Sequence, residues 1–288
     1  MKNGMHNVSV VHLIWLPFGK EHFKKFIDSY LKYTASYPHQ LVFVFNGTSV
    51  QHPDKTESYI NYLEEYGIKE YKSFYFDAGQ DIDIYQKVAA SLDSELVIFL
   101  NSYSEIRANN WLSFYIDNFD ANTGIISATA SCQSYYSSVY QKNTWRWETG
   151  KGFNHNFRKY KLFIKAFFYW RFLFKPFPNP HVRTNAFMVR RTAFLEIRPA
   201  IIDTKFKAYI FESGNNGLSG YYIKKGLKLL VVDKYGKPYE MKEWQNSFTF
   251  WRYNQENLLV SDNQTGIYDK ASTEEKRSMT KLAWGINE

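Results

Sequence analysis

The sequence predicts an α/β protein with a Rossmann-type layered sheet that is mostly parallel and carries helices on both faces. Three observations lead to this prediction. Strand-like and helix-like segments alternate before residue 105. The strand-like segments are near-continuous apolar runs, which is typical of strands buried on both faces. Turn-forming or polar residues follow each run, as expected where parallel strands are joined by crossover helices.

Apolar runs and breaker residues place the elements of the first half in order. Strands are expected over 8–16, 41–45, 71–76 and 96–100, because these runs are rich in β-branched and aromatic residues and end at Pro, Asn, Asp or Gly. Helices are expected over 23–36, 55–66 and 84–92, where apolar residues recur at helical spacing.

The second half has a different pattern. Another strand is expected over 125–130 and a further one over 186–189, and a helix is expected to end at Gly226. Longer aromatic stretches replace the regular alternation, without a low-complexity linker or a solenoid repeat. We therefore expect one domain, or two tightly fused lobes, divided at about residue 130 into 1–130 and an elaborated half, 131–288.

The segment 158–175 predicts a basic amphipathic helix. On a helical wheel its cations gather on one arc, and its large apolar residues lie opposite. The cations are Arg158, Lys161, Lys165, Arg171 and Lys175, and the apolar residues include Leu162, Phe163, Phe167, Trp170, Leu173 and Phe174. Such a helix suits an anionic membrane surface, but its aromatic face can equally be core. Both interpretations stay open.

Composition narrows the class of protein. No apolar run approaches the roughly 20 residues that cross a bilayer, so we expect a soluble or peripheral protein. Nothing at the start of the sequence resembles a secretory signal, which favours the cytoplasm. The single cysteine, Cys132, excludes an intrachain disulfide. With 19% aromatic residues and a net charge of +8, an anionic partner is expected. Nucleic acid is disfavoured, because no motif that reads DNA or RNA is present.

The candidate ligand site follows from the sheet. In doubly wound sheets ligands lie beyond the carboxyl ends of the strands. The residues there are Leu16, Pro17, Asn46, Asp77 and the run from Asn101 to Glu105. No dinucleotide fingerprint and no phosphate loop occurs, which removes the main support for dinucleotide oxidoreductases and P-loop enzymes. A nucleotidyltransferase is also disfavoured, since 16–20 is a poor phosphate loop.

Four stretches give the chain a family resemblance. They are 81–85, 99–105 with Trp111-Leu112, 183–188 and 211–214. In their order and spacing the sequence resembles the GT-A glycosyltransferases, and more narrowly the bacterial family-two-like transferases of surface polysaccharides such as O-antigen and capsule. The resemblance implies a nucleotide-sugar donor bound by 1–130 and a glycan acceptor, free or lipid-linked, bound by 131–288. It also implies a cytoplasmic enzyme, peripheral on the inner face of the bacterial plasma membrane.

The strand ends and the resemblance together assign roles to individual residues. Those expected to bind the donor are Leu16, Pro17, Asn46, Asp77, Asp81, Asp83, Asn101, Ser102, Glu105 and Arg183, and those expected to bind the acceptor are His181, Asn185, Trp244 and Arg252. In this fold the loop after the fourth strand usually holds Mn²⁺ or Mg²⁺ through an Asp-x-Asp motif. Here only Glu105 is acidic. Metal dependence stays open, since Arg183, Arg190 or Arg252 can neutralise a diphosphate instead.

Glu212 is the expected catalytic base. Inverting transfer needs a carboxylate beside the acceptor hydroxyl, whose oxygen becomes nucleophilic as its proton leaves. Glu212 stands where the resemblance places that carboxylate, although it can also serve only as a helix cap. The sequence thus predicts an inverting hexosyl- or deoxyhexosyltransferase. One alternative is a non-catalytic carbohydrate-binding protein, favoured by the aromatic residues and the positive charge. The other is a catalytically dead GT-A paralogue, favoured by the missing carboxylate pair.

Overall fold

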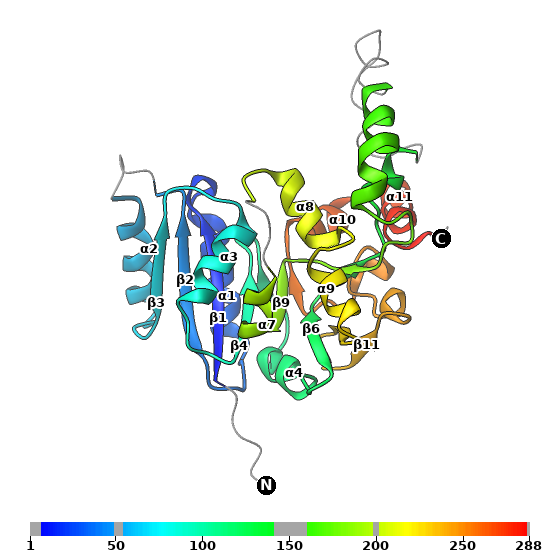
Figure 1. Cartoon of the computed structure of the whole chain (residues 1–288). Helices are drawn as coiled ribbons and strands as arrows, with labels where there is room; N and C mark the ends of the chain where they lie inside the picture. Colours follow the sequence, from blue (N-terminus) through cyan, green and yellow to red (C-terminus); the bar gives the residue numbers. More distant parts are fainter. Residues whose placement is uncertain (1–6, 49–53, 141–159, 198–201, 287–288) are drawn as a thin grey trace.

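The computed structural model describes residues 7–48, 54–140, 160–197 and 202–286. Its centre is an eight-stranded sheet with the order β11-β10-β6-β9-β4-β1-β2-β3 (Figure 1). The strands are β1 Val8–Trp15, β2 Gln40–Asn46, β3 Lys72–Phe76, β4 Leu96–Leu100, β6 Thr123–Ser127, β9 Ala186–Arg190, β10 Lys228–Val232 and β11 Pro238–Glu240. Strands from after residue 131 therefore complete the sheet that the first half begins.

The sheet is mixed but mostly parallel, as the sequence predicted. Strands β1, β2, β3 and β4 are mutually parallel. Strand β9 lies antiparallel between β4 and β6, and β11 is antiparallel to β10. Because β9 starts where β4 ends, Ala186 pairs with Leu100. The carboxyl ends of β1, β2, β3 and β4 and the amino end of β9 consequently meet at one edge, which we call the strand-end edge.

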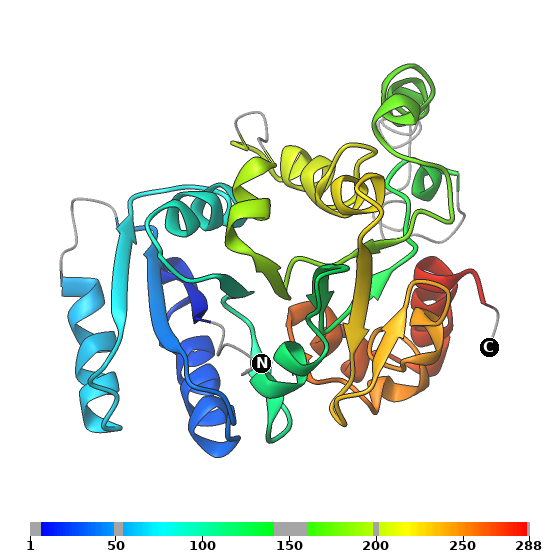
Figure 2. The same cartoon turned by 60° about the horizontal axis from the view of Figure 1, so that its bottom comes forward.

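Helices cover both faces of the sheet, as the two views in Figures 1 and 2 show. The longer ones are α1 Lys20–Lys32, α2 Asp54–Glu65, α3 Asp81–Ala90, α4 Trp111–Asp117, α7 Arg191–Glu196, α8 Lys205–Ser213, α9 Leu218–Lys224, α10 Asn263–Lys270 and α11 Thr273–Trp284. None of the helices in the described ranges combines the length and apolarity needed to cross a bilayer.

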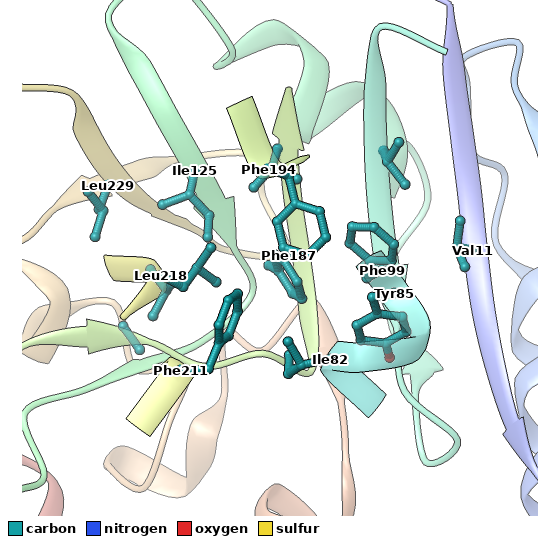
Figure 3. Packing of buried hydrophobic residues seen from close by; sticks show 14 of the residues in the cluster. Val11, Ile82, Tyr85, Phe99, Ile125, Phe187, Phe194, Phe211, Leu218 and Leu229 are labelled. Carbon is teal, nitrogen blue, oxygen red and sulfur yellow. The ribbon is translucent and has the colours of Figure 1, made fainter. Parts of the chain in front are cut away.

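Alternating side chains divide the core into two layers. Successive residues of a strand point to opposite faces of a sheet, so Val11 and Leu13 join one cluster while Val10 and Ile14 join the other. In the first cluster Phe99 and other strand residues pack against α3, α7, α8 and α9 (Figure 3). The second cluster lies under α1, α2 and α4. Burial on both faces explains the near-continuous apolar runs of these strands.

Some elements differ from the predictions. The run 125–130 is divided between β6 and the short strand β7, Ala130–Ser131, which pairs with β8, His181–Val182, in a separate two-stranded sheet. Another small sheet joins β5, Glu105–Ile106, to β12, Val260–Ser261. Helices α10 and α11 were not predicted, although each begins with a capping box, at Asp262 and at Ser272. These capping boxes were the signal that could have located both helices.

The predicted helix 158–175 is not one regular α-helix. Residues 160–165 are α-helical, Ala166–Trp170 form a π-helical turn, and Arg171–Leu173 (α6) return to α-helical geometry. Arg158 lies outside the described residues. The predicted aromatic face is divided: Trp170 and Phe174 are buried, while Phe163 and Phe167 are exposed. The extra residue in a π-turn rotates the next residues of the helix around its axis, so one apolar face is not maintained.

The core contains an unusual histidine at the centre of β1. His12 is fully buried and stacks on Phe26 with ring centroids 3.7 Å apart. Neither of its ring nitrogens has a hydrogen-bond partner among the described residues. Burial lowers the pKa of His12 to about 3, because a charged imidazolium would lose its hydration there. The folded protein therefore holds His12 neutral, whereas the unfolded chain protonates it near its ordinary pKa.

This histidine predicts a pH-dependent stability. Above pH 6.5 both states are neutral at His12, and as pH falls toward 3 only the unfolded state gains the proton, so stability is lost on acidification. Between pH 7 and pH 5 the loss is about 2 kcal/mol for this one group. We expect His12→Phe to remove this contribution to the loss of stability. Chemical denaturation of both proteins at pH 7 and pH 5 measures it. An identical pH dependence in both proteins would contradict this interpretation.

Candidate active site

Side chains from three strand ends tie the strand-end edge together. The Ser102 hydroxyl accepts a hydrogen bond from the Trp15 amide at 3.0 Å, which links the ends of β4 and β1. Asn46 donates from its side-chain amide to the Gly79 carbonyl at 3.0 Å and so holds the loop that leads into α3. Leu16 and Pro17 lie in a 3₁₀ turn directly after β1. The edge is therefore a fixed framework for a ligand.

The loop after β4 forms a tight polar turn. Asn101 accepts hydrogen bonds from the Tyr103 amide at 3.0 Å and from the Ser104 hydroxyl at 3.2 Å, both on its side-chain oxygen. The Tyr103 ring packs against Phe18 and His22, with centroids 5.0 Å and 4.4 Å away. Phe18 itself is exposed. Where the resemblance leads us to expect a carboxylate pair, this chain presents an amide and an aromatic group.

Glu105 does not belong to the polar turn after β4 but faces helix α1. It lies on β5, and its carboxylate is 3.8 Å from the ammonium of Lys25 on α1. Both residues line a cavity of about 550 Å³ together with Arg107 and Lys234. The described residues contain no group of three or more His, Cys, Asp or Glu side chains able to hold a metal ion. The loop after β4 thus does not supply the carboxylate pair that the resemblance leads us to expect there.

The three aspartates near β3 have separate environments. Asp77 accepts a hydrogen bond from the Thr48 hydroxyl at 3.3 Å, and Asp83 pairs with Lys87 at 2.7 Å on α3. Asp81, the first residue of α3, stays accessible at the surface, but the protein around it desolvates its carboxyl group. This desolvation raises the pKa of Asp81; nearby Glu212 also raises it, and Lys205 lowers it. Asp81, Lys205 and Glu212 are therefore electrostatic neighbours.

Glu212 lies in the last turn of α8 and, as predicted from the sequence, before a helix that ends near Gly226, which is α9. One carboxylate oxygen, Oε2, accepts hydrogen bonds from the amide of Thr184, at 3.2 Å, and from its hydroxyl. The other, Oε1, is 3.9 Å from Nε2 of His181, which is too long for a hydrogen bond. The Glu212 side chain is 22% exposed. One oxygen is thus held in place and the other can receive a proton.

His181 leaves the charge of Glu212 uncompensated. It is buried, and its Nδ1 lies 2.8 Å from the Asn179 carbonyl. A carbonyl only accepts, so Nδ1 carries the hydrogen and Nε2, facing Glu212, carries a lone pair. Burial lowers the pKa of His181, with Glu212 acting in the opposite direction. A neutral histidine beside Glu212 leaves this carboxylate without an ion pair there.

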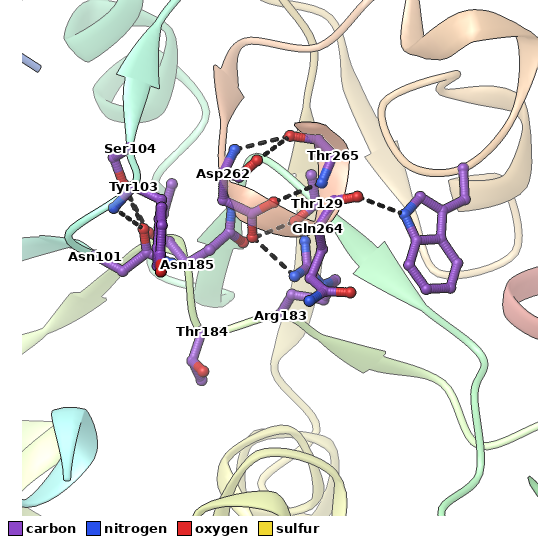
Figure 4. A network of polar contacts seen from close by, with 12 residues as sticks. Asn101, Tyr103, Ser104, Thr129, Arg183, Thr184, Asn185, Asp262, Gln264 and Thr265 are labelled. Atoms are coloured by element: carbon purple, nitrogen blue, oxygen red, sulfur yellow. Dashed lines mark hydrogen bonds and ion pairs between the residues drawn. The ribbon is translucent and has the colours of Figure 1, made fainter. Parts of the chain in front are cut away.

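Arg183 and Asp262 form a largely buried ion pair near the edge (Figure 4). A guanidinium nitrogen of Arg183 lies 2.8 Å from a carboxylate oxygen of Asp262. The side chain of Arg183 is 13% exposed and that of Asp262 is 1% exposed. Arg183 also approaches the Thr129 hydroxyl at 3.3 Å, and Thr129 donates at 2.8 Å to the side-chain oxygen of Asn185. The Arg183 guanidinium stacks on the Phe250 ring, 4.3 Å from its centroid. Arg183 therefore connects the sheet to the C-terminal lobe and is already neutralised by Asp262.

The other predicted cations and the predicted tryptophan have different surroundings. Arg190 pairs with Glu95 at 2.7 Å, and its position in the sheet is opposite Leu96, where β4 begins. The expectation that Arg190 meets a diphosphate is therefore wrong, because β9 runs antiparallel to β4. Arg252 donates to the Gln245 carbonyl at 2.8 Å. Trp244 is 1% exposed and belongs to the core.

Sequence reasoning missed several residues of this site. Lys205 adjoins the predicted residues but follows no motif, and Tyr103 and Thr184 lie in predicted stretches that gave them no role of their own. Asp262 is the exception, because its capping box is visible in the sequence. Its pairing with Arg183 depends on tertiary structure and left no local signal.

No family model and no curated protein matches this sequence. Solved structures do match. GalNAc-T7, solved with UDP, GalNAc and Mn²⁺, aligns over 96% of this chain and 52% of its own, with a TM-score of 0.50 and 15% identity. The mannosyltransferase PcManGT from Pyrobaculum calidifontis, solved with GDP-Man and Mn²⁺, aligns over 97% of this chain and 69% of its own, with a TM-score of 0.49 and 11% identity.

A third match is partial. S. aureus TarS 1-349, solved with UDP-GlcNAc, aligns over 42% of this chain and 33% of its own, with a TM-score of 0.31 and 15% identity. The chain spans about half the length of GalNAc-T7. The match to GalNAc-T7 extends over nearly the whole of this chain and agrees with its mixed eight-stranded sheet. The chain therefore has the GT-A fold of glycosyltransferases.

Proposed function

We propose that this protein is an inverting glycosyltransferase that moves a sugar from a nucleotide diphosphate to a hydroxyl of a bacterial surface glycan. The observation that carries the proposal is the placement of Glu212. Its Oε2 is fixed by Thr184, and its Oε1 faces a neutral His181 beside the strand-end edge. A positioned, unpaired carboxylate is what deprotonation of an acceptor hydroxyl requires.

The donor is proposed to lie along the strand-end edge. Leu16, Pro17, Asn46 and Ser102 form its fixed part, and Asp77, Asp81 and Asp83 offer acceptors for the hydroxyl or base groups of a nucleoside. GalNAc-T7, of the same fold, was solved with UDP and GalNAc, which supports a nucleotide-sugar donor. Lys205 is the cation we propose for the diphosphate, because it is close enough to lower the pKa of Asp81 and is exposed.

The proposal does not specify whether transfer requires a divalent metal ion, and the assay measures this. GalNAc-T7 was solved with Mn²⁺. In this chain Asn101 uses its side-chain oxygen within its own turn, and Glu105 faces Lys25. We assign no step to Mn²⁺ or Mg²⁺, and transfer is to be assayed both with and without a divalent cation.

The acceptor is proposed to approach from the second half of the chain. His181 and Asn185 lie next to Glu212 and the Arg183 network, and we propose that this region, within 131–288, receives the acceptor glycan. Residues 1–130 would hold the donor. The proposed acceptor is linked to a lipid carrier at the inner face of the bacterial plasma membrane, where surface glycans are assembled. The hexosyl or deoxyhexosyl identity of the sugar is part of the same proposal.

A second candidate is a non-catalytic sugar-binding relative of such enzymes. Asn101 and Tyr103 in place of carboxylates favour it. Measuring turnover separates the two candidates. The protein is incubated with a panel of UDP-, GDP- and dTDP-sugars, with and without Mn²⁺, and with a membrane lipid extract as the source of acceptor. Release of nucleoside diphosphate measures turnover. NMR of the product gives its anomeric configuration. Acceptor-dependent release with inverted configuration supports transfer. Sugar binding without release supports the second candidate.

A further inference from the structure

The segment 160–175 exposes an unusual set of aromatic side chains. Phe168 is 66% exposed and Phe172 65%, and Tyr160, Phe163, Phe167 and Tyr169 are each at least 39% exposed. We call the exposed side chains of 160–175 the aromatic–basic surface. In Figure 1 its helix extends away from the sheet at the top of the molecule. Contiguous exposed apolar groups of this kind mark interaction sites in proteins.

The way the helix is anchored explains this exposure. Its buried residues are Ala166, Trp170 and Phe174, four positions apart. They pack with Tyr135 and Phe206 in a small cluster of their own, separate from the two main core layers. The remaining aromatics have no place in that cluster. The exposed aromatic residues therefore lie on the side of the helix that faces away from this small cluster.

The same surface is entirely basic in its charges. Lys161, Lys165, Arg171 and Lys175 are exposed, and no Asp or Glu occurs between residues 160 and 175. The Arg171 guanidinium lies 4.6 Å from the ring centroids of both Phe167 and Phe172. Cations are thus interleaved with aromatic rings, which is the composition that binds the boundary between headgroups and acyl chains of an anionic bilayer.

We propose that the aromatic–basic surface docks on an anionic lipid bilayer, with the phenylalanines at the acyl boundary and the lysines at lipid phosphates. Charge complementarity favours this occupant over a second copy of the chain, whose identical surface would bring like charges together. Docking goes beyond the proposed transfer reaction and does not depend on it. If the proposed function also holds, docking brings the site to a lipid-linked acceptor.

Vesicle flotation tests the proposal with matched variants. The full chain is mixed with vesicles of phosphatidylglycerol and phosphatidylcholine, or of phosphatidylcholine alone. We expect binding only to the anionic vesicles. Phe168→Ser with Phe172→Ser lowers the partition coefficient by more than about tenfold, since two apolar groups leave the boundary. The control is Tyr235→Ser with Ile267→Ser, which are 70% and 53% exposed elsewhere and leave binding unchanged.

Charge reversal provides an independent arm. Lys165→Glu with Lys175→Glu lowers anionic binding by more than about 25-fold, since each cation lost near the bilayer costs roughly fivefold and the added carboxylates are repelled as well. Lys69→Glu with Lys270→Glu is the control. It changes the net charge by the same amount at exposed residues outside the aromatic–basic surface, and it has a much smaller effect on binding. Absence of wild-type flotation, equal binding to neutral vesicles, or self-association abolished by the phenylalanine variant would each overturn the proposal. Flotation of an inactive Glu212→Gln protein would leave it intact.

Discussion

Glu212→Gln is expected to lower kcat for sugar transfer by about 10²- to 10⁴-fold, the range that a general base contributes. The amide keeps the shape of the side chain and can still accept hydrogen bonds from Thr184 through its carbonyl oxygen. It cannot take a proton from the acceptor hydroxyl. Donor affinity should change little, because Glu212 is proposed to act on the acceptor. Steady-state kinetics with the active donor measure both quantities.

Glu196→Gln is the matched control for this experiment. Glu196 also ends a helix, but it is exposed and bound to Lys225 and Tyr221. Its replacement should leave kcat unchanged. Turnover of Glu212→Gln equal to that of the wild type would remove Glu212 from the mechanism. A large loss in both variants would point to a structural effect instead.

Asp262→Ala is expected to lower the free energy of unfolding by about 3–5 kcal/mol, as for removal of one partner from a buried ion pair. The substitution leaves Arg183 almost buried without its counter-charge. It also removes the side chain that accepts from the Thr265 amide at the start of α10. Lost capping adds typically about 1 kcal/mol. Chemical denaturation at neutral pH provides the measurement.

Two further variants separate the ion pair from the cap. Asp203→Ala breaks an exposed pair with Lys207 and should cost less than about 1 kcal/mol. Asp262→Asn with Arg183→Met keeps an oxygen for capping and removes both charges, so it should recover much of the loss. A cost for Asp262→Ala no greater than that for Asp203→Ala would show that the Arg183 contact contributes little to stability.

The sheet could be predicted because its physics is local. Strands buried on both faces need continuous apolar runs, so β4 appears over the predicted residues 96–100. The ends of these apolar runs also predicted where the strands end, and therefore that Asn46 and Ser102 lie at the strand-end edge. Glu212 was found only through family resemblance, and its helix α8 was not predicted because 205–213 mixes polar and apolar residues without a clear period.

Long-range pairing set the limit of prediction. Arg183 was predicted to bind the donor, but its ion pair with Asp262 could not be predicted, because Asp262 lies far along the chain and only the fold brings the two residues together. The aromatic residues show the same limit. Trp244 and Phe168 are both large aromatic residues in the sequence, yet one is in the core and the other is exposed. Phe168 lies within a π-helical turn, which the sequence pattern did not predict.

Donor binding at the strand-end edge is the central claim, and a thermal-shift titration with UDP, GDP and dTDP, with and without Mn²⁺, tests it most directly. A nucleotide at about 100 times its Kd stabilises the folded chain by about 2.7 kcal/mol, a shift of roughly 5 °C. We predict this shift for at least one nucleotide, and its loss in Asp81→Asn. Because desolvation raises the pKa of Asp81, the free variant should unfold at the same temperature or slightly higher. Stabilisation by none of the nucleotides, or an equal shift in Asp81→Asn, would contradict donor binding at this edge.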